Sequence, residues 1–131
     1  MIALDTNVLV RLLTRDDAKQ AESARTLLEQ YAEVDDALYV SDIVLAELVW
    51  TLDRTYGLSR AQIARTVDAL VNNATLQFES RAVLRTALQS FVGSKAGFVD
   101  CLILAKAKSA GCVALVTFDK ALFGLAGVRA V

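Results

Sequence analysis

Short apolar runs alternate with longer amphipathic segments along the chain. The short runs predict β-strands, at 2–4, 38–40, 76–78, 113–117 and 128–131. Apolar residues spaced three and four positions apart predict the helices, at 8–13, 17–31, 43–56, 59–72, 80–92 and 98–110. Strand 113–117 is almost wholly apolar, which is typical of a strand covered on both faces. This alternation predicts an α/β fold, a three-layer α/β/α sandwich with a central, mainly parallel sheet.

Polar residues and glycines mark the ends of the predicted elements. Asp17 and Gln20 have the spacing of a capping box, Ser41 is a good N-cap, and Gly111 ends the last long helix. The chain has 131 residues, no proline and only six glycines, which leaves no flexible linker. We therefore expect one domain over residues 1–131.

The charge balance and the absence of histidine exclude several kinds of function. Fourteen Lys and Arg against fifteen Asp and Glu give a net charge of -1, so we expect no bulk attraction to nucleic acid. The chain has no histidine, which excludes Ser-His-Asp and Cys-His catalysis and every His-ligated metal site. Any chemistry must therefore use carboxylates, hydroxyls or amines.

The sequence lacks the features of an exported or membrane-bound protein. The N-terminus has no basic segment followed by an apolar stretch, and no run approaches the ~20 apolar residues of a membrane span. The two cysteines, Cys101 and Cys112, lack zinc-site spacing and are interpreted as reduced, small core residues. We expect a soluble, cytoplasmic protein.

Four acidic residues stand out because their neighbours are apolar or because they follow strands. Asp5 directly follows the first strand, and Asp119 follows strand 113–117 by one intervening residue. Glu47 and Asp100 lie among apolar residues in the first or second turn of helices. Ligands of parallel sheets bind outside the carboxyl ends of the strands, so all four can converge at one sheet edge.

Each of these acids alone has an ordinary structural explanation. Asp100 is also suited to stabilising the first turn of its helix, and Glu47 to pairing with an arginine. Taken together, four close carboxylates would repel one another unless some were protonated or a divalent cation lay among them. An all-oxygen ligand set selects Mg²⁺ or Mn²⁺ over zinc. Such a cation polarises a phosphoryl oxygen and activates water, so phosphodiester hydrolysis is the natural reaction.

The same residues form four motifs in a recognisable order. They are Leu4-Asp5-Thr6-Asn7, Ser41 with Glu47 six residues later, Phe98-Val99-Asp100 and Val116-Thr117-Phe118-Asp119. In this order, over nearly the full length, they resemble the PIN-domain ribonucleases. The single-domain size and the opening Leu-Asp-Thr-Asn-Val-Leu-Val-Arg are similar to the VapC-type toxins of toxin-antitoxin pairs.

The resemblance implies an α/β/α endoribonuclease that needs Mg²⁺ or Mn²⁺, cleaves structured RNA such as tRNA or rRNA, and is neutralised by a cognate antitoxin. It assigns the metal site to Asp5, Glu47, Asp100 and Asp119. It makes Asn7 and Thr117 polar supports of these carboxylates. Relatives often carry a further acid where this chain has Gly97.

The candidate RNA contacts are four cations near the predicted acids: Arg11, Arg15, Lys95 and Lys120. For each of the four, an ordinary solvated position on the protein surface explains the charge equally well. Trp50, one turn from Glu47, is expected to pack in the core or a dimer interface rather than stack on a base. Broad apolar faces on helices 8–13 and 43–56 favour a homodimer.

Two other functions remain open. A haloacid-dehalogenase-like phosphatase also begins with a strand that ends in Asp, but it needs a second Asp where this chain has Asn7. A PIN-like module that binds RNA or a partner without cutting is the non-enzymatic alternative.

Overall fold

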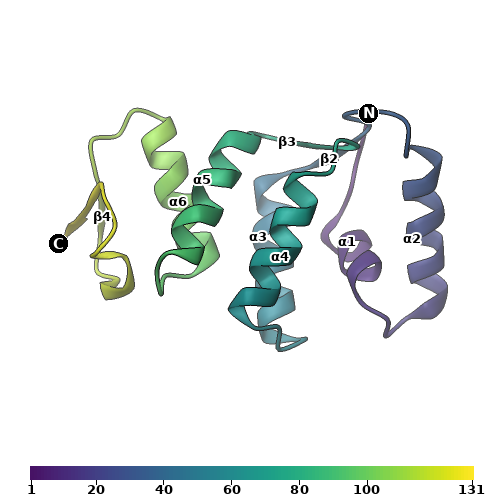
Figure 1. Cartoon of the computed structure of the whole chain (residues 1–131), viewed down its shortest axis with the longest axis horizontal. Coiled ribbons are helices and arrows are strands. Elements are labelled where there is room, and N and C mark those ends of the chain that lie inside the picture. The colour runs from purple at the N-terminus through teal and green to yellow at the C-terminus, as the bar shows by residue number, and fades with distance from the viewer. The chain divides into compact units, whose positions relative to one another are not determined.

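A computed structural model describes all residues of the chain, 1–131. Strands and helices alternate as predicted (Figure 1). The elements are β1 (Ile2–Ala3), α1 (Thr6–Leu13), α2 (Ala18–Gln30), β2 (Leu38–Val40), α3 (Asp42–Arg54), α4 (Arg60–Val71), β3 (Leu76–Phe78), α5 (Arg81–Val92), α6 (Phe98–Ser109), β4 (Leu115–Thr117), the 3₁₀ turn η1 (Lys120–Leu122) and β5 (Val128–Ala130). No helix is both long enough and apolar enough to span a bilayer.

The chain divides into two compact units, which we describe separately. Unit 1 contains Met1–Leu58 and Ala69–Glu79, and unit 2 contains Ser59–Asp68 and Ser80–Val131. Helix α4 contributes residues to both units.

Unit 1 is built on a three-stranded parallel sheet of order β1-β2-β3. Ile2 pairs with Leu38, which in turn pairs with Leu76. Helix α1 packs against α2 and α3 (Figure 1). The side chains of Leu9 and Leu45 are fully buried, so the apolar faces of α1 and α3 contribute to the core.

Unit 2 consists of the packed pair α5 and α6 together with a two-stranded parallel sheet. The rings of Phe91 and Phe98 meet edge to face with their centroids 5.8 Å apart, one near the end of α5 and one at the start of α6. In the sheet, Leu115 of β4 pairs with Val128 of β5.

The structure confirms the α/β class and the parallel strands, with five differences from the predictions. Cys101 is buried as expected, but Cys112 is exposed because it follows the end of α6. The parallel strands form two sheets, one in each unit. Strand β4 is not covered on both faces by its own unit, since Val113 beside it and Val116 within it are 92% and 54% exposed. A two-stranded sheet buries too little surface to enclose a strand. Helix α1 begins at Thr6, and η1 was not predicted because one 3₁₀ turn has no periodicity to detect.

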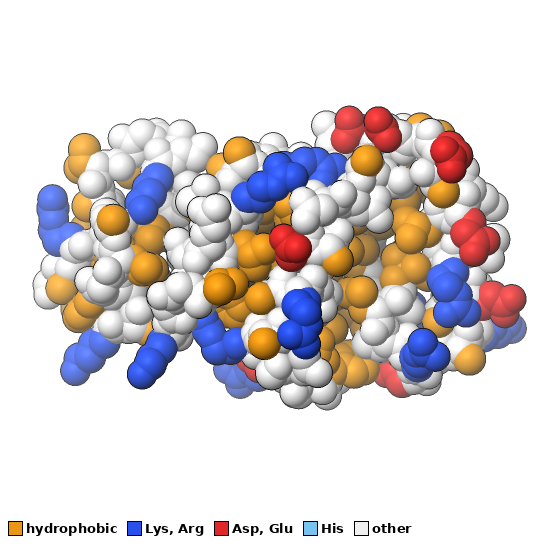
Figure 2. All heavy atoms as spheres, viewed as in Figure 1, with side chains coloured by type: hydrophobic (Ala, Val, Ile, Leu, Met, Phe, Trp, Pro, Cys, Tyr) orange, Lys and Arg blue, Asp and Glu red, His pale blue; other side chains and the backbone are white.

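The two units differ sharply in charge. Unit 1 carries twelve acidic and five basic side chains, whereas unit 2 carries three acidic and nine basic side chains. The basic residues of unit 2 are Arg60, Arg65, Arg81, Arg85, Lys95, Lys106, Lys108, Lys120 and Arg129. Figure 2 shows Lys and Arg, but no Asp or Glu, over α5, α6 and β4 on the face drawn. The net charge of the chain is therefore the sum of an acidic unit and a basic unit that nearly cancel.

Candidate functional site: two carboxylate pairs

Asp5 is fixed at the junction of β1 and α1. Its backbone is extended, and its Oδ1 accepts a hydrogen bond from the Thr6 N–H at 2.7 Å, so Asp5 is the N-cap of α1. Leu4, directly before it, is buried and donates its N–H to the Tyr39 carbonyl of β2. The Asp5 carboxylate is therefore fixed by the strand pairing before it and by the helix cap after it, at the carboxyl end of a parallel strand.

Thr6 connects the start of α1 with Glu47 on α3. The Thr6 hydroxyl donates to Glu47 Oε1 at 3.3 Å, and Thr6 is only 8% exposed. Helix α3 is itself anchored at its N-terminus, where Ser41 caps Val44 and the Glu79 carboxylate accepts the Asp42 N–H at 2.6 Å. Asp5 and Glu47 thus form a pair in unit 1 through Thr6, whose backbone N–H donates to Asp5 and whose hydroxyl donates to Glu47.

The surroundings of Glu47 correct one premise of the sequence analysis. Glu47 is not buried among apolar residues but lies on the exposed face of α3 between Ile43 and Trp50, which are 75% and 59% exposed. The buried face of the helix is formed by Leu45, Leu48, Val49 and Leu52. Its hydrogen-bond partner is a threonine rather than an arginine, and Trp50 is not a core residue of its unit.

Asp100 and Asp119 form the second pair, in unit 2. Asp100 lies in the first turn of α6 and is partly buried. Burial raises the pKa of Asp100, and the negative charge of Asp119 raises it further. Two carboxylates that repel each other provide a setting that a bound cation would stabilise.

Thr117 holds the backbone that presents Asp119. The Asp119 N–H donates to the Thr117 hydroxyl at 3.0 Å, and Asp119 Oδ1 accepts the Ala121 N–H at 3.0 Å as the N-cap of η1. One oxygen of Asp119 is used for this cap. The Thr117 hydroxyl therefore contacts the main chain of Asp119 rather than its carboxylate.

Gly97 leaves room for the Asp100 carboxylate. Gly97 is the N-cap of α6 and makes no side-chain capping bond. A β-carbon built on it would lie 3.2 Å from Asp100 Oδ2, closer than ordinary van der Waals contact. A larger side chain at this position would crowd the Asp100 carboxylate.

Arg60 holds the loop that leads into α6. Its guanidinium donates to the carbonyls of Phe91 at 2.7 Å and Ser94 at 3.0 Å, and it lies 4.0 Å from the centre of the Phe91 ring. Ser94 continues the network by donating its hydroxyl to the Ser90 carbonyl and accepting the Ala96 N–H. The loop that positions Asp100 is therefore fixed at several points.

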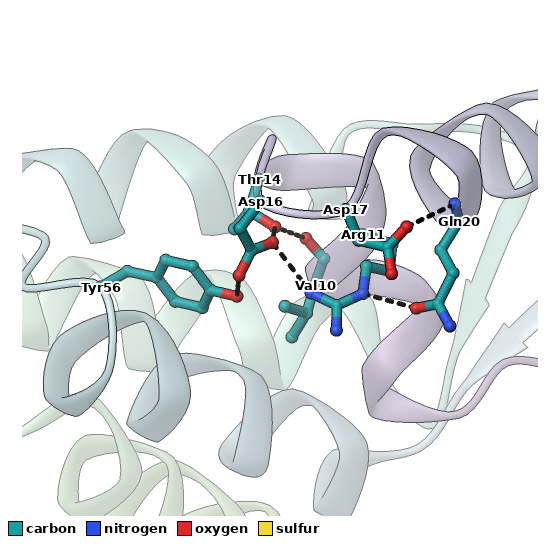
Figure 3. Close-up of polar contacts among 7 residues, drawn as sticks. All are labelled: Val10, Arg11, Thr14, Asp16, Asp17, Gln20 and Tyr56. Atoms are coloured by element: carbon teal, nitrogen blue, oxygen red, sulfur yellow. Dashed lines mark hydrogen bonds and ion pairs between the residues drawn. The ribbon is translucent and has the colours of Figure 1, made fainter.

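The other predicted residues lie elsewhere in the two units. Asn7 and Arg11 line a hollow of about 300 Å³ between α1 and α2. Arg11 is held by Asp16 at 2.9 Å and by Gln20 at 2.7 Å (Figure 3). The remaining candidate RNA contacts are exposed: Arg15, Lys95 and Lys120.

Sequence reasoning did not identify three residues that shape these pairs. Thr6 stood within the first motif, so its position directly after Asp5 was a usable signal. The role of Gly97 appears only when the nearby Asp100 carboxylate is placed in three dimensions. Arg60 gave no signal, because its carbonyl partners lie 31 and 34 positions away.

The donor set fits a hard divalent cation. Each pair offers carboxylate oxygens beside a hydroxyl, and neither unit has a histidine or a cysteine among these groups. Neither unit by itself gathers three or more acidic or sulfur ligands.

The fold of the chain is that of a known class of protein. The PIN domain family profile matches residues 2–128, and the chain belongs to this family. It is 29% identical over 120 residues to a VapC ribonuclease of Aquifex aeolicus, covering 92% of this chain and 88% of that protein.

Two solved structures are also similar over nearly the full chain. One is a toxin-antitoxin complex from Klebsiella pneumoniae, with 23% identity, a TM-score of 0.39, and coverage of 98% of this chain and 96% of that one. The other is VapC20 of Mycobacterium tuberculosis, a sarcin-ricin loop cleaving toxin, with 22% identity, a TM-score of 0.43, and coverage of 98% and 97%.

Proposed function

We propose that this chain is a VapC-type endoribonuclease toxin that uses Mg²⁺ or Mn²⁺ to cleave structured RNA such as tRNA or rRNA. The PIN domain match over residues 2–128 and the similarity to a VapC ribonuclease over 120 residues support this activity. The family match runs through both units, so we take residues 1–131 as one PIN domain that acts in the cytoplasm.

The observation that carries the proposal is the presence of two carboxylate pairs, each held by a hydroxyl-bearing residue. Asp5, Glu47, Asp100 and Asp119 would hold the cation, which supplies charge for the scissile phosphate and activates water. Thr6 orients Glu47, and Thr117 orients the backbone of Asp119.

The chain's own cations would bind the RNA backbone. Arg15, Lys95 and Lys120 are exposed and able to contact phosphates, whereas Arg11 is engaged by Asp16 and Gln20 and would act with its remaining N–H groups. Asn7 would support the carboxylate of Asp5 from two residues away.

We also propose an antitoxin partner and a homodimer. The antitoxin follows from the VapC similarity. The dimer is supported by the exposed apolar side chains Ile43 and Trp50 on α3. Light scattering tests the dimer, and co-expression with the neighbouring small open reading frame tests the antitoxin. A strict monomer that forms no complex would contradict both.

The decisive experiment is cleavage of total RNA with Mn²⁺ or Mg²⁺ by the wild type and by Asp5→Asn, Glu47→Gln, Asp100→Asn and Asp119→Asn, with cut sites mapped by sequencing. Each variant should lose cleavage by roughly 100-fold or more while remaining folded. The control is Asp53→Asn, an exposed acid on α3, which should cleave like the wild type.

Two results would favour the other functions. Hydrolysis of a phosphomonoester with no cleavage of RNA would indicate the phosphatase. Binding of Mn²⁺ and RNA without any cleavage would indicate the non-cutting module.

A further inference from the structure

We propose that unit 2 supplies the electrostatic attraction for RNA, through four exposed cations that we call the basic set: Lys95, Lys108, Lys120 and Arg129. This inference rests on the proposed function, because it locates the RNA backbone contacts of that activity on the chain. It goes beyond the earlier candidates, of which only Lys95 and Lys120 belong to this set.

The basic side chains of unit 2 outnumber its acidic side chains by three to one. Of its three acids, Asp100 and Asp119 form the carboxylate pair, which leaves only Asp68 outside the proposed site. Nine basic side chains against three acidic ones give unit 2 a strongly positive balance. Polyanions bind to such surfaces because each phosphate contact releases condensed counterions.

Two members of the basic set lie next to the carboxylate pair in the sequence, and two lie on other elements of unit 2. Lys95 lies in the loop that leads into α6, and Lys120 directly follows Asp119. At the other end of α6, Lys108 lies against the turn before β5, because a β-carbon on Gly127 would be 2.9 Å from Lys108 Cε. Arg129 lies in β5 itself.

The spacing suits an extended phosphate backbone rather than a single anion. Residues 100 and 108 of α6 are separated by about 12 Å along the helix axis. Cations near both ends of that helix can therefore contact phosphates of different nucleotides, and Asp100 lies in its first turn. Unit 1 offers no equivalent, because its twelve acids outnumber its five cations.

The test measures binding of fluorescein-labelled bulk tRNA in EDTA, where cleavage cannot interfere, over a series of salt concentrations. The variants are Lys95→Gln/Lys120→Gln and Lys108→Gln/Arg129→Gln. The matched control is Lys19→Gln/Arg25→Gln, which removes one Lys and one Arg from exposed positions of α2 in unit 1. All three proteins carry the same change in net charge.

We expect the slope of log affinity against log salt to fall in magnitude by about 0.7 to 0.9 for each contacting charge removed from the basic set. The control should keep the wild-type slope. Equal losses in the unit 1 and unit 2 variants would show that only net charge matters and would overturn the inference. Unchanged slopes in both unit 2 variants, or no binding of tRNA by the wild type, would also overturn it.

Failure of this inference is distinguishable from failure of the proposed function. A wild-type chain that binds tRNA through the basic set but never cleaves RNA with Mn²⁺ contradicts the nuclease proposal alone. Metal-dependent cleavage that disappears in Asp100→Asn, together with salt slopes insensitive to the basic set, contradicts this inference alone.

Discussion

The hydroxyl of Thr6 donates to Oε1 of Glu47 across 3.3 Å, although the two residues are 41 positions apart in the sequence. Thr6 is also the residue whose N–H is capped by Asp5, so a single buried threonine contacts two of the proposed metal ligands. The relative placement of these two carboxylates therefore depends on its hydroxyl and on its backbone.

Thr6→Val should reduce metal-dependent cleavage by roughly 10-fold to 100-fold, because it removes the hydroxyl that orients Glu47 while retaining the shape of the side chain. Steady-state cleavage over a Mn²⁺ titration should show a higher half-saturating Mn²⁺ concentration. Urea unfolding should change by only about 1 kcal/mol, the net value of one hydrogen bond.

Thr6→Ser is the matched control, because it keeps the hydroxyl and loses one methyl group. It should bind Mn²⁺ nearly as the wild type does, which calorimetry can measure without any reaction. A Thr6→Val protein with wild-type Mn²⁺ affinity would show that Thr6 has no part in placing Glu47.

Chelation should abolish cleavage. EDTA removes the cation that the oxygen donors would hold, and added Mg²⁺ or Mn²⁺ should restore the rate, whereas Zn²⁺ should restore it poorly. The measurement is RNA cleavage after exhaustive dialysis against chelator, followed by addition of each metal. Activity that persists after dialysis would point to metal-free chemistry.

Gly97→Ala should weaken metal binding without lowering the free energy of unfolding. The new methyl group would lie 3.2 Å from Asp100 Oδ2 and push the carboxylate aside, which should weaken Mn²⁺ binding several-fold. The Gly97 φ of -68° suits alanine, so the free energy of unfolding should stay the same or rise by about 0.4–1 kcal/mol.

The matched control is Gly124→Ala, at a position where an added β-carbon meets nothing within 4 Å. Its Mn²⁺ affinity should equal that of the wild type. If Gly97→Ala binds Mn²⁺ as tightly as Gly124→Ala does, the crowding of Asp100 has no functional consequence.

The sequence predicted the order and type of the regular elements because each has strong local signals. The predicted N-caps Asp17 and Ser41 each accept a backbone N–H in the structure. The parallel pairing followed from apolar strands separated by helices. Local chemistry was therefore enough to define the elements and the fold class.

The remaining features depend on contacts that no local pattern encodes. The apolar neighbours of Glu47 suggested burial, but Ile43 and Trp50 share its exposed face of α3 because side chains three and four positions apart lie together. The overall charge of -1 predicted no bulk attraction to nucleic acid, but it could not locate a local basic surface, because a sum over the chain cannot show how the charges divide between two units.

Arg60→Met should lower the free energy of unfolding by about 1–3 kcal/mol, because it removes two hydrogen bonds to carbonyls and a cation–π contact with Phe91. Arg60→Lys should have an intermediate effect, because a single ammonium lacks the planar fork that serves both carbonyls. Hydrogen exchange at the Ala96 amide should also accelerate, since its acceptor is Ser94.

Arg65→Met is the control for Arg60, because Arg65 is exposed on the same helix and makes none of these contacts. It should unfold at nearly the wild-type urea concentration. Equal stability of the Arg60→Met and Arg65→Met proteins would show that the loop before α6 is held without Arg60.

Tyr56→Phe should destabilise the chain more at neutral pH than in acid. The Tyr56 hydroxyl donates to Asp16 Oδ2 at 2.6 Å, and this hydrogen bond is the main cause that lowers the pKa of Asp16 below 3.8 (Figure 3). A lowered pKa in the folded chain means that ionised Asp16 adds stability above about pH 3.8, which is lost as the pH falls through the lowered value. The difference in the free energy of unfolding between wild type and Tyr56→Phe, measured with urea across this range, should therefore narrow in acid.

Tyr31→Phe, at the end of α2, is the control and should show no such pH dependence. A Tyr56→Phe difference that is constant with pH would mean that the hydroxyl does not act through the charge of Asp16.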